Sequence, residues 1–110
     1  MKYITAVFKP SRLDAVLDAV TSAGASGVTV TEVRGHGKQK GHTAVYRGKE
    51  YNVSLLPKMQ VEVVVPDTIA EEAIRVIVEA ARTGEIGDGR VFVLPVDHGY
   101  NIRTGERDMT

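Results

Sequence analysis

The period of the hydrophobic positions changes several times along the chain, and each change marks an expected element. Residues 2–8 are β-rich, and Pro10 closes this first expected strand. Apolar residues then recur at helical spacing, with Ser11 as the expected N-cap and Gly24 as the stop. Residues 27–33 alternate with β-branched side chains and predict a second strand. The apolar positions of the helix are Leu13, Val16, Leu17 and Val20.

The second half of the chain repeats this order. Residues 59–65 predict a third strand, which Pro66 closes, and Asp67 or Thr68 is the expected cap of a second helix. Residues 90–96 predict a fourth strand, and the tail from Asp97 is polar. The apolar side of the second helix is Ile69, Ala73, Ile74, Ile77 and Ala81.

The resulting order β-α-β-β-α-β predicts an α+β fold, a ferredoxin-like sandwich formed by residues 1–110 as one domain. In the third strand, Val61, Val63 and Val65 are expected to face the helices. The opposite face contains Glu62 and Val64 and is not polar enough to be fully solvated. Self-association through this face, giving a homo-oligomer, is therefore expected.

A long polar segment, residues 35–51, separates the second and third strands. It is cationic and glycine-rich, and no helical or strand period is visible in it. Structureless insertions of this length are usually functional, so we expect an arm that contacts a partner and is largely disordered in the free protein over residues 38–52. Tyr46 and Tyr51 lie in this segment. Each is either accessible to a modifying enzyme or folded back on the protein, and composition leaves both open.

Composition narrows the class of protein. The 14 basic and 14 acidic residues balance, so no overall attraction to nucleic acid or anionic lipid is expected. Cysteine is absent, no apolar run is long enough to span a bilayer, and residues 1–5 do not resemble a signal peptide. We expect a soluble cytoplasmic protein that is not embedded in a membrane.

Two glycine-rich segments are candidate phosphate sites. In residues 83–90, three glycines let backbone amides approach a ligand closely, with Arg90 beside them. A helix C-cap followed by a turn explains the same glycines. Gly35 and Gly37 begin a GxGxxG pattern that lacks its third glycine. Further cations that could converge on these segments are Lys38, Lys40, Lys58 and Arg103.

No pattern in the sequence indicates catalysis. His36, His42 and His98 lack the spacing of a metal site, and no Ser–His–Asp arrangement can be defended. Glu71 and Glu72 lie in the first turns of the expected helix, where acidic residues offset the helix dipole. We therefore expect a protein that is not an enzyme.

Six blocks in this chain closely resemble the PII nitrogen-regulatory signal-transduction proteins, and together they span nearly its whole length. They are TVTEV (29–33), GKQKGHT (37–43), YRGKEY (46–51), LPK (56–58), ARTGEIGDGR (81–90) and IRTGE (102–106). The resemblance implies a homotrimer that binds ATP or ADP in competition, in three clefts between subunits. By analogy, residues 37–55 are the T-loop, residues 82–90 the B-loop, and residues 97–110 the C-terminal segment.

The resemblance also implies the roles of individual residues. Arg90 and the B-loop backbone would hold the phosphates, Arg103 would reach them from the neighbouring subunit, and Thr29, Val64 and Glu62 would lie near the adenine. 2-Oxoglutarate would chelate a Mg²⁺ ion on the ATP phosphates, Gln39 would complete the coordination, and Lys58 would pair with the distal carboxylate. The implied nucleotide residues are Thr29, Gly35, Gly37, Lys38, Gln39, Glu62, Val64, Gly87, Asp88, Gly89, Arg90 and Arg103, and those for 2-oxoglutarate are Gln39, Lys40, Gly41, Lys58 and Gly87.

The implied partners act through the T-loop. Arg47 matches the residue that enters the pore of an ammonium transporter, and Tyr51 matches the position modified by a nucleotidylyltransferase. Other implied partners are enzymes and regulators of nitrogen metabolism. The chain departs from the family at three sites: Lys38 stands where Arg is usual, Arg90 where Lys is usual, and Asn101 where many members have Arg.

Three other readings stay open. The chain could be a divergent PII-like nucleotide sensor that serves another pathway without responding to 2-oxoglutarate, and Asn101 favours this reading. It could be a small nucleotide hydrolase, although no base is evident beside the glycine segments. It could also be a structural trimer that binds no nucleotide.

Overall fold

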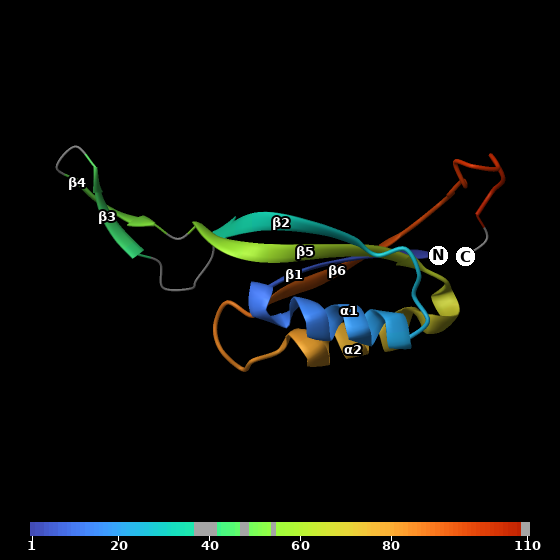
Figure 1. Cartoon of the computed structure of the whole chain (residues 1–110), viewed down its shortest axis with the longest axis horizontal. Helices are drawn as coiled ribbons and strands as arrows, with labels where there is room; N and C mark the ends of the chain where they lie inside the picture. Colours follow the sequence, from blue (N-terminus) through green and yellow to red (C-terminus); the bar gives the residue numbers. More distant parts are fainter. Residues whose placement is uncertain (37–41, 47–48, 54, 109–110) are drawn as a thin grey trace.

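The computed structural model describes residues 1–36, 42–46, 49–53 and 55–108, and only the backbone of residues 42–46 and 49–53. Within these residues, no helix is long and apolar enough to cross a membrane. The elements, labelled in Figure 1, are β1 (Lys2–Phe8), a 3₁₀ turn (Pro10–Arg12), α1 (Leu13–Ser22), β2 (Thr29–His36), β3 (His42–Tyr46), β4 (Lys49–Val53), β5 (Leu55–Val65), α2 (Asp67–Ala81) and β6 (Gly89–Pro95).

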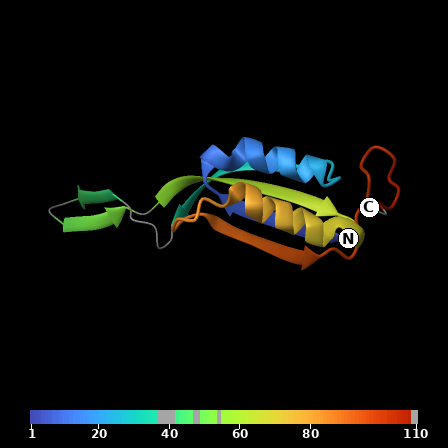
Figure 2. The same ribbon diagram turned by 90° about the horizontal axis from the view of Figure 1, so that it is seen from below.

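Four strands form one antiparallel sheet in the order β2-β5-β1-β6. Helices α1 and α2 lie side by side on one face of this sheet, as Figures 1 and 2 show. This arrangement confirms the expected α+β fold of ferredoxin-like type. The other face, which we call the outer face, is not covered by any element of the four-stranded domain.

The core lies between the sheet and the two helices. Every second residue of β1 is buried, namely Ile4, Ala6 and Phe8, and β5 contributes Val61, Val63 and Val65. The expected inward face of β5 is thus confirmed. Each fully buried aliphatic or aromatic side chain contributes about 1.5–3 kcal/mol relative to an exposed position. The helices complete the core with Val16, Val20, Ala70, Ala73, Ile77 and Ala81.

Both expected helix caps are wrong. Ser11 lies inside the 3₁₀ turn that precedes α1, and Arg12 occupies the N-cap position without a side-chain bond. Pro66 is the N-cap of α2, again without a side-chain bond. The Asp67 carboxylate instead lies 3.2 Å from the α-amino group of Met1, so it connects the start of α2 to the start of β1.

Strands β2 and β5 extend further than the sequence pattern indicated. They pair without a break from Thr29 opposite Glu62 to His36 opposite Leu55. Pro57 lies inside β5, two residues before the point where the sequence analysis expected this strand to begin. Proline fits there because β1 pairs with β5 only as far as Met59, so one side of Pro57 has no neighbouring strand within the sheet.

The sequence analysis expected no strand in the segment between β2 and β5. This expectation is wrong. Strands β3 and β4 pair with each other in a separate two-stranded sheet, with Ala44 opposite Tyr51. A short hairpin of this kind needs only local backbone pairing. It therefore leaves no long period of apolar residues in the sequence.

Candidate functional site

The B-loop is organised by the carboxylate of Asp88. Its Oδ2 accepts hydrogen bonds from the backbone amides of Thr83 and Gly84, each 2.8 Å long, and its Oδ1 accepts one from the Thr83 hydroxyl. These donors, the Thr83 hydroxyl first, hold the pKa of Asp88 well below its usual range. The loop between α2 and β6 is thus closed on itself by one ionised side chain.

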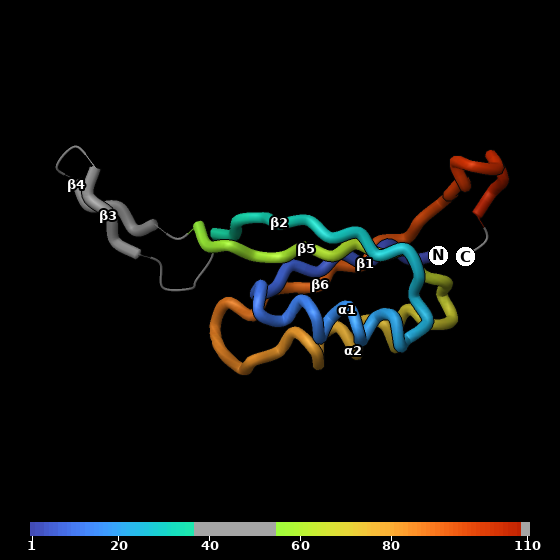
Figure 3. Tube along the Cα trace, in the orientation of Figure 1, coloured from blue at the N-terminus to red at the C-terminus, as the bar shows by residue number. Residues whose placement is uncertain are grey.

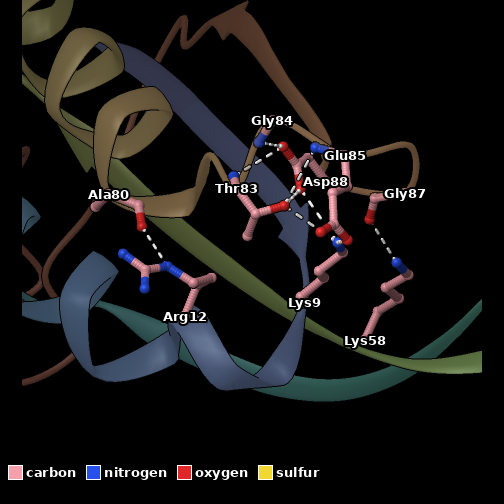
Figure 4. Close-up of polar contacts among 9 residues, drawn as sticks. All are labelled: Lys9, Arg12, Lys58, Ala80, Thr83, Gly84, Glu85, Gly87 and Asp88. Carbon is pink, nitrogen blue, oxygen red and sulfur yellow. Dashed lines mark hydrogen bonds and ion pairs between the residues drawn. The ribbon is translucent and has the colours of Figure 1, made fainter.

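Lys9, at the end of β1, joins this cluster. Its Nζ lies 3.4 Å from Asp88 Oδ1 and 3.6 Å from Glu85 Oε2, and it donates a 3.2 Å hydrogen bond to the Thr83 hydroxyl (Figure 4). The sequence analysis did not single out Lys9, because no motif surrounds it. Only the pairing of β1 with β6 brings it to the loop.

Lys58 connects β5 to the same loop. Its Nζ donates a 2.7 Å hydrogen bond to the carbonyl of Gly87 (Figure 4), and only 8% of the residue is exposed. Burial, and then the nearby charge of Lys9, lower the pKa of Lys58. Gly35 lies beside it, since a Cβ at position 35 would be 3.2 Å from Lys58 Cγ. The structure therefore brings Gly35, Lys58, Gly87 and Asp88 together.

Gly89 and Arg90 place the end of the B-loop against β1. Gly89 has φ +109°, and a Cβ there would lie 1.8 Å from the carbonyl oxygen of Val7. Only glycine allows this approach. The register then sets Arg90 opposite Val7, with the Arg90 side chain exposed at the edge of the loop.

The glycines of the loop do not form a simple helix cap. Arg82, at the C-terminal end of α2, is extended, and the first left-handed glycine, Gly84 at φ +88°, comes two residues later. The amides of Thr83, Gly84 and Glu85 bond within the loop. The first half of the B-loop is thus a self-contained turn that precedes residues 86–90.

A second group of expected site residues lies farther along the outer face. Thr29 is directly opposite Glu62 in the register, and both line a hollow together with Val64. Tyr3 lines the same hollow and donates a hydrogen bond from its hydroxyl to Glu62 Oε2. The sequence analysis did not single out Tyr3, since a single tyrosine in a strand carries no motif.

The two groups are separate within one chain. Glu62 follows Lys58 by four residues on β5, which is about 13 Å at about 3.3 Å per strand residue. Arg103 lies exposed in the C-terminal segment, and Figure 3 shows that this segment (red) and the B-loop (orange) lie at opposite ends of the sheet. Asn101 stays within that segment, where its Oδ1 accepts a 3.1 Å bond from the amide of Thr104.

Several expected site residues lie outside the residues that the structure describes. They are Gly37, Lys38, Gln39, Lys40, Gly41 and Arg47. Tyr51 is described by its backbone alone, in β4. Among the residues whose side chains are described, no cluster of histidine, aspartate and glutamate could hold a metal ion.

Comparison with known proteins decides the family. The family model of nitrogen regulatory protein P-II matches residues 1–106. The chain belongs to the P-II family. P-II proteins are signal-transduction regulators, and the resemblance drawn from the sequence blocks is confirmed.

Curated P-II proteins match over almost the whole chain. The nitrogen regulatory protein P-II of Rhizobium etli is 51% identical over 108 residues, and that of Haemophilus influenzae is 53% identical over 108 residues. Nitrogen regulatory protein P-II 1 of Escherichia coli is 52% identical over 108 residues. Each match covers 98% of this chain and 96% of the relative, so the P-II relationship includes the B-loop and most of the C-terminal segment.

Proposed function

We propose that this P-II protein is a non-enzymatic metabolite sensor that binds ATP or ADP in competition and responds to 2-oxoglutarate. The observation that carries the proposal is the corner where Lys58 is bonded to Gly87 of the B-loop. A nearly buried ammonium group beside a glycine-rich backbone turn suits a ligand with several anionic groups. Membership of the P-II family supports the same assignment.

The proposed assembly is a homotrimer, in which each nucleotide site combines two half-sites from different subunits. The outer face supports this, because Phe92 and Leu94 are 56% and 54% exposed there. The separation of the two residue groups within one chain supports it further. A head-to-tail ring would set the B-loop end of one subunit against the Glu62 end of the next.

The phosphate half-site comprises the B-loop and the start of the T-loop. The backbone at Gly87, Asp88 and Gly89 would hold the phosphates together with Arg90. The Asp88 carboxylate shapes the loop and does not face the phosphates, because its oxygens accept bonds from Thr83 and Gly84. The remaining residues proposed for this half-site are Gly35, Gly37, Lys38 and Gln39.

The base half-site is the hollow that contains Thr29, Glu62 and Val64. An apolar side chain beside a hydroxyl and a carboxylate offers both a surface and acceptors to a purine. Arg103 of the same subunit would extend from the C-terminal segment to the phosphates held by its neighbour. The C-terminal segment lies at the end of the sheet opposite the B-loop, which fits this role (Figure 3).

The proposed 2-oxoglutarate site adjoins the phosphate half-site. Lys58 fits one carboxylate, since its ammonium is held within the structure next to Gly87. Mg²⁺ prefers oxygen ligands and would enter on the ATP phosphates, with Gln39 as a protein ligand. Lys40, Gly41 and Gly87 would contribute backbone amides to the bound 2-oxoglutarate.

Ligands at this corner would control the T-loop, residues 37–55. Strands β2 and β5 lead from the T-loop into the sheet, and Gly35 and Lys58 lie at that junction. A ligand that contacts the junction differently in two loop conformations shifts their populations. The proteins proposed to bind the T-loop are an ammonium transporter, contacted by Arg47, and enzymes or regulators of nitrogen metabolism. A nucleotidylyltransferase that modifies Tyr51 is a further proposed partner, and the proposed location is the cytoplasm.

One observation favours a second candidate, a divergent P-II nucleotide sensor that does not respond to 2-oxoglutarate. Asn101 carries no charge, and its side-chain oxygen is already bonded to the amide of Thr104. This position therefore contributes no cation to a phosphate. A weaker hold on the ATP phosphates would also weaken any site that depends on the bound Mg²⁺.

Calorimetric titration separates the two candidates. ATP with Mg²⁺ is titrated first, and 2-oxoglutarate is then titrated with and without saturating Mg-ATP. Binding of 2-oxoglutarate only in the presence of Mg-ATP supports the nitrogen and carbon sensor. Nucleotide binding with no 2-oxoglutarate binding supports the divergent sensor, and turnover in a phosphate-release assay would contradict both.

A further inference from the structure

The hydroxyl of Tyr3 contacts a carboxylate of the proposed base half-site, that of Glu62. A second carboxylate, that of Asp108, lines the same hollow. Tyr3 on β1 and Glu62 on β5 lie on the outer face, where Thr5 is directly opposite Glu62 and Tyr3 is one step further along the same face. Tyr3 Oη donates to Glu62 Oε2, and both residues are half-buried. Thr29 flanks Glu62 on the other side, from β2.

This contact changes what Glu62 can offer to a ligand. An ionised carboxylate is an acceptor only, and its two oxygens together can receive two parallel donors. In this structure Tyr3 takes one of the two acceptor positions of Oε2, so Oε1 is the stronger acceptor for a ligand. The bond to Glu62 raises the pKa of Tyr3, so the phenol keeps its proton, and its role as donor, at neutral pH.

Adenine and guanine make different demands on such a group. The Watson–Crick edge of guanine has two neighbouring donors, N1–H and the N2 amine, which match a carboxylate with both oxygens free. Adenine has one amine, N6, beside the acceptor N1, and needs only one acceptor oxygen. Thr29, with a hydroxyl that donates or accepts, can serve the neighbouring ring nitrogen.

We propose that Tyr3 is a specificity-determining residue, which engages one oxygen of Glu62 and thereby favours adenine over guanine nucleotides. The inference rests on the proposed nucleotide site. It assigns to Tyr3 a positioning role, exerted through Glu62. The selectivity is in part negative, because one of the two acceptors that guanine would use is already engaged by Tyr3 and is therefore weaker.

The test compares ATP and GTP binding by calorimetry, on the full chain with Mg²⁺. Tyr3→Phe removes the hydroxyl and keeps the ring. We expect the ratio of ATP to GTP affinity to fall by about tenfold, since one matched hydrogen-bonding pair discriminates between bases by about that much or more. The matched control is Gln60→Met, which breaks another cross-strand side-chain bond of this face, the 3.0 Å bond to Thr5, and should keep the wild-type ratio.

A second experiment, in the Glu62→Gln variant, shows whether Tyr3 changes the ATP to GTP affinity ratio through Glu62. In Glu62→Gln, the side chain has one acceptor oxygen and cannot receive both donors of guanine, so adding Tyr3→Phe should change the ratio by less than about twofold. A purely structural role for Tyr3 would weaken both nucleotides equally and leave the ratio constant, which would overturn the inference and leave the nucleotide site standing. A wild-type protein that binds neither nucleotide would overturn both.

Discussion

Lys58 donates a 2.7 Å hydrogen bond to the carbonyl of Gly87, and this bond joins the first part of β5 to the loop after α2. Position 58 is otherwise part of the extension of β5 beyond β1. The bond therefore couples the root of the T-loop to the B-loop. A ligand that recruits the ammonium of Lys58 acts on both loops at once.

Replacing Lys58 should separate the two proposed ligands. Lys58→Met keeps the length and the apolar stem of the side chain but removes its charge. We expect the heat of 2-oxoglutarate binding to disappear, while ATP is still bound with an affinity within about tenfold of the wild type. Calorimetry measures both, and Lys2→Met controls for the loss of one positive charge elsewhere. Unchanged 2-oxoglutarate binding in Lys58→Met would remove Lys58 from the site.

Asp88 should make the B-loop sensitive to acid. Its pKa is lowered on folding from an ordinary value of 3.8, so the unfolded chain takes up the proton first as the pH falls. The stabilisation is therefore complete above about pH 4 to 5 and is lost at lower pH. Thermal unfolding at pH 6 and at pH 3 should show Asp88→Asn less stable than wild type at pH 6, with a smaller difference at pH 3. A constant difference would contradict the account.

Among the described glycines of the site, Gly89 should tolerate substitution by a residue with a Cβ least well. A Cβ at Gly89 meets the backbone of Val7, which cannot yield as a flexible side chain would. Gly89→Ala should lower the free energy of unfolding by about 3 kcal/mol or more. Gly27→Ala is the matched control, because Gly27 has φ +72° with open space around it and should cost about 1–2 kcal/mol. Urea denaturation compares the two, and equal costs would argue against the close contact.

Hydrogen exchange should divide the strands into two classes. Strands β3 and β4 pair only with each other, and an isolated two-stranded hairpin is marginally stable in water. Their amides should exchange far faster than those of β1 and β5, which are central in the four-stranded sheet. Protection of Tyr51 equal to that of Ile4 would show that the hairpin is held in the free protein. The expected disorder over residues 38–52 stays a prediction that the same experiment tests.

The fold was accessible from the sequence because its signals are local. Alternation in Val61, Val63 and Val65 and the helical spacing of Ala73 and Ile77 set the inward faces, and the structure agrees with them. The helix caps were wrong because capping residues are common in turns that do not cap. Ser11 belongs to the 3₁₀ turn, and Asp67 pairs with the amino terminus.

The site was accessible only in part. The sequence blocks identified Lys58 and the B-loop as candidates. The role of Asp88 in closing the loop could not be predicted, because it depends on which donors its carboxylate oxygens bond to. Lys9 and Tyr3 became visible only when strand pairing brought them to Asp88 and Glu62. Contacts between residues 59 or 79 positions apart leave no trace in local periodicity.

The most direct test of the central account is subunit complementation. Arg90→Glu damages the phosphate half-site, and Arg103→Glu alters the C-terminal segment at the opposite end of the sheet. Both side chains are exposed, so neither change should prevent folding. Each variant alone should fail to bind ATP.

When the two variants are unfolded together and refolded as a mixture, random assembly of a ring should restore about a quarter of the wild-type ATP sites. About one interface in four then joins an intact phosphate half-site to a subunit with an intact Arg103. Calorimetry and light scattering of the mixture measure stoichiometry and size. Trimers with restored binding are the predicted result, and a mixture that binds no ATP, or a monomer that binds it, would contradict the account.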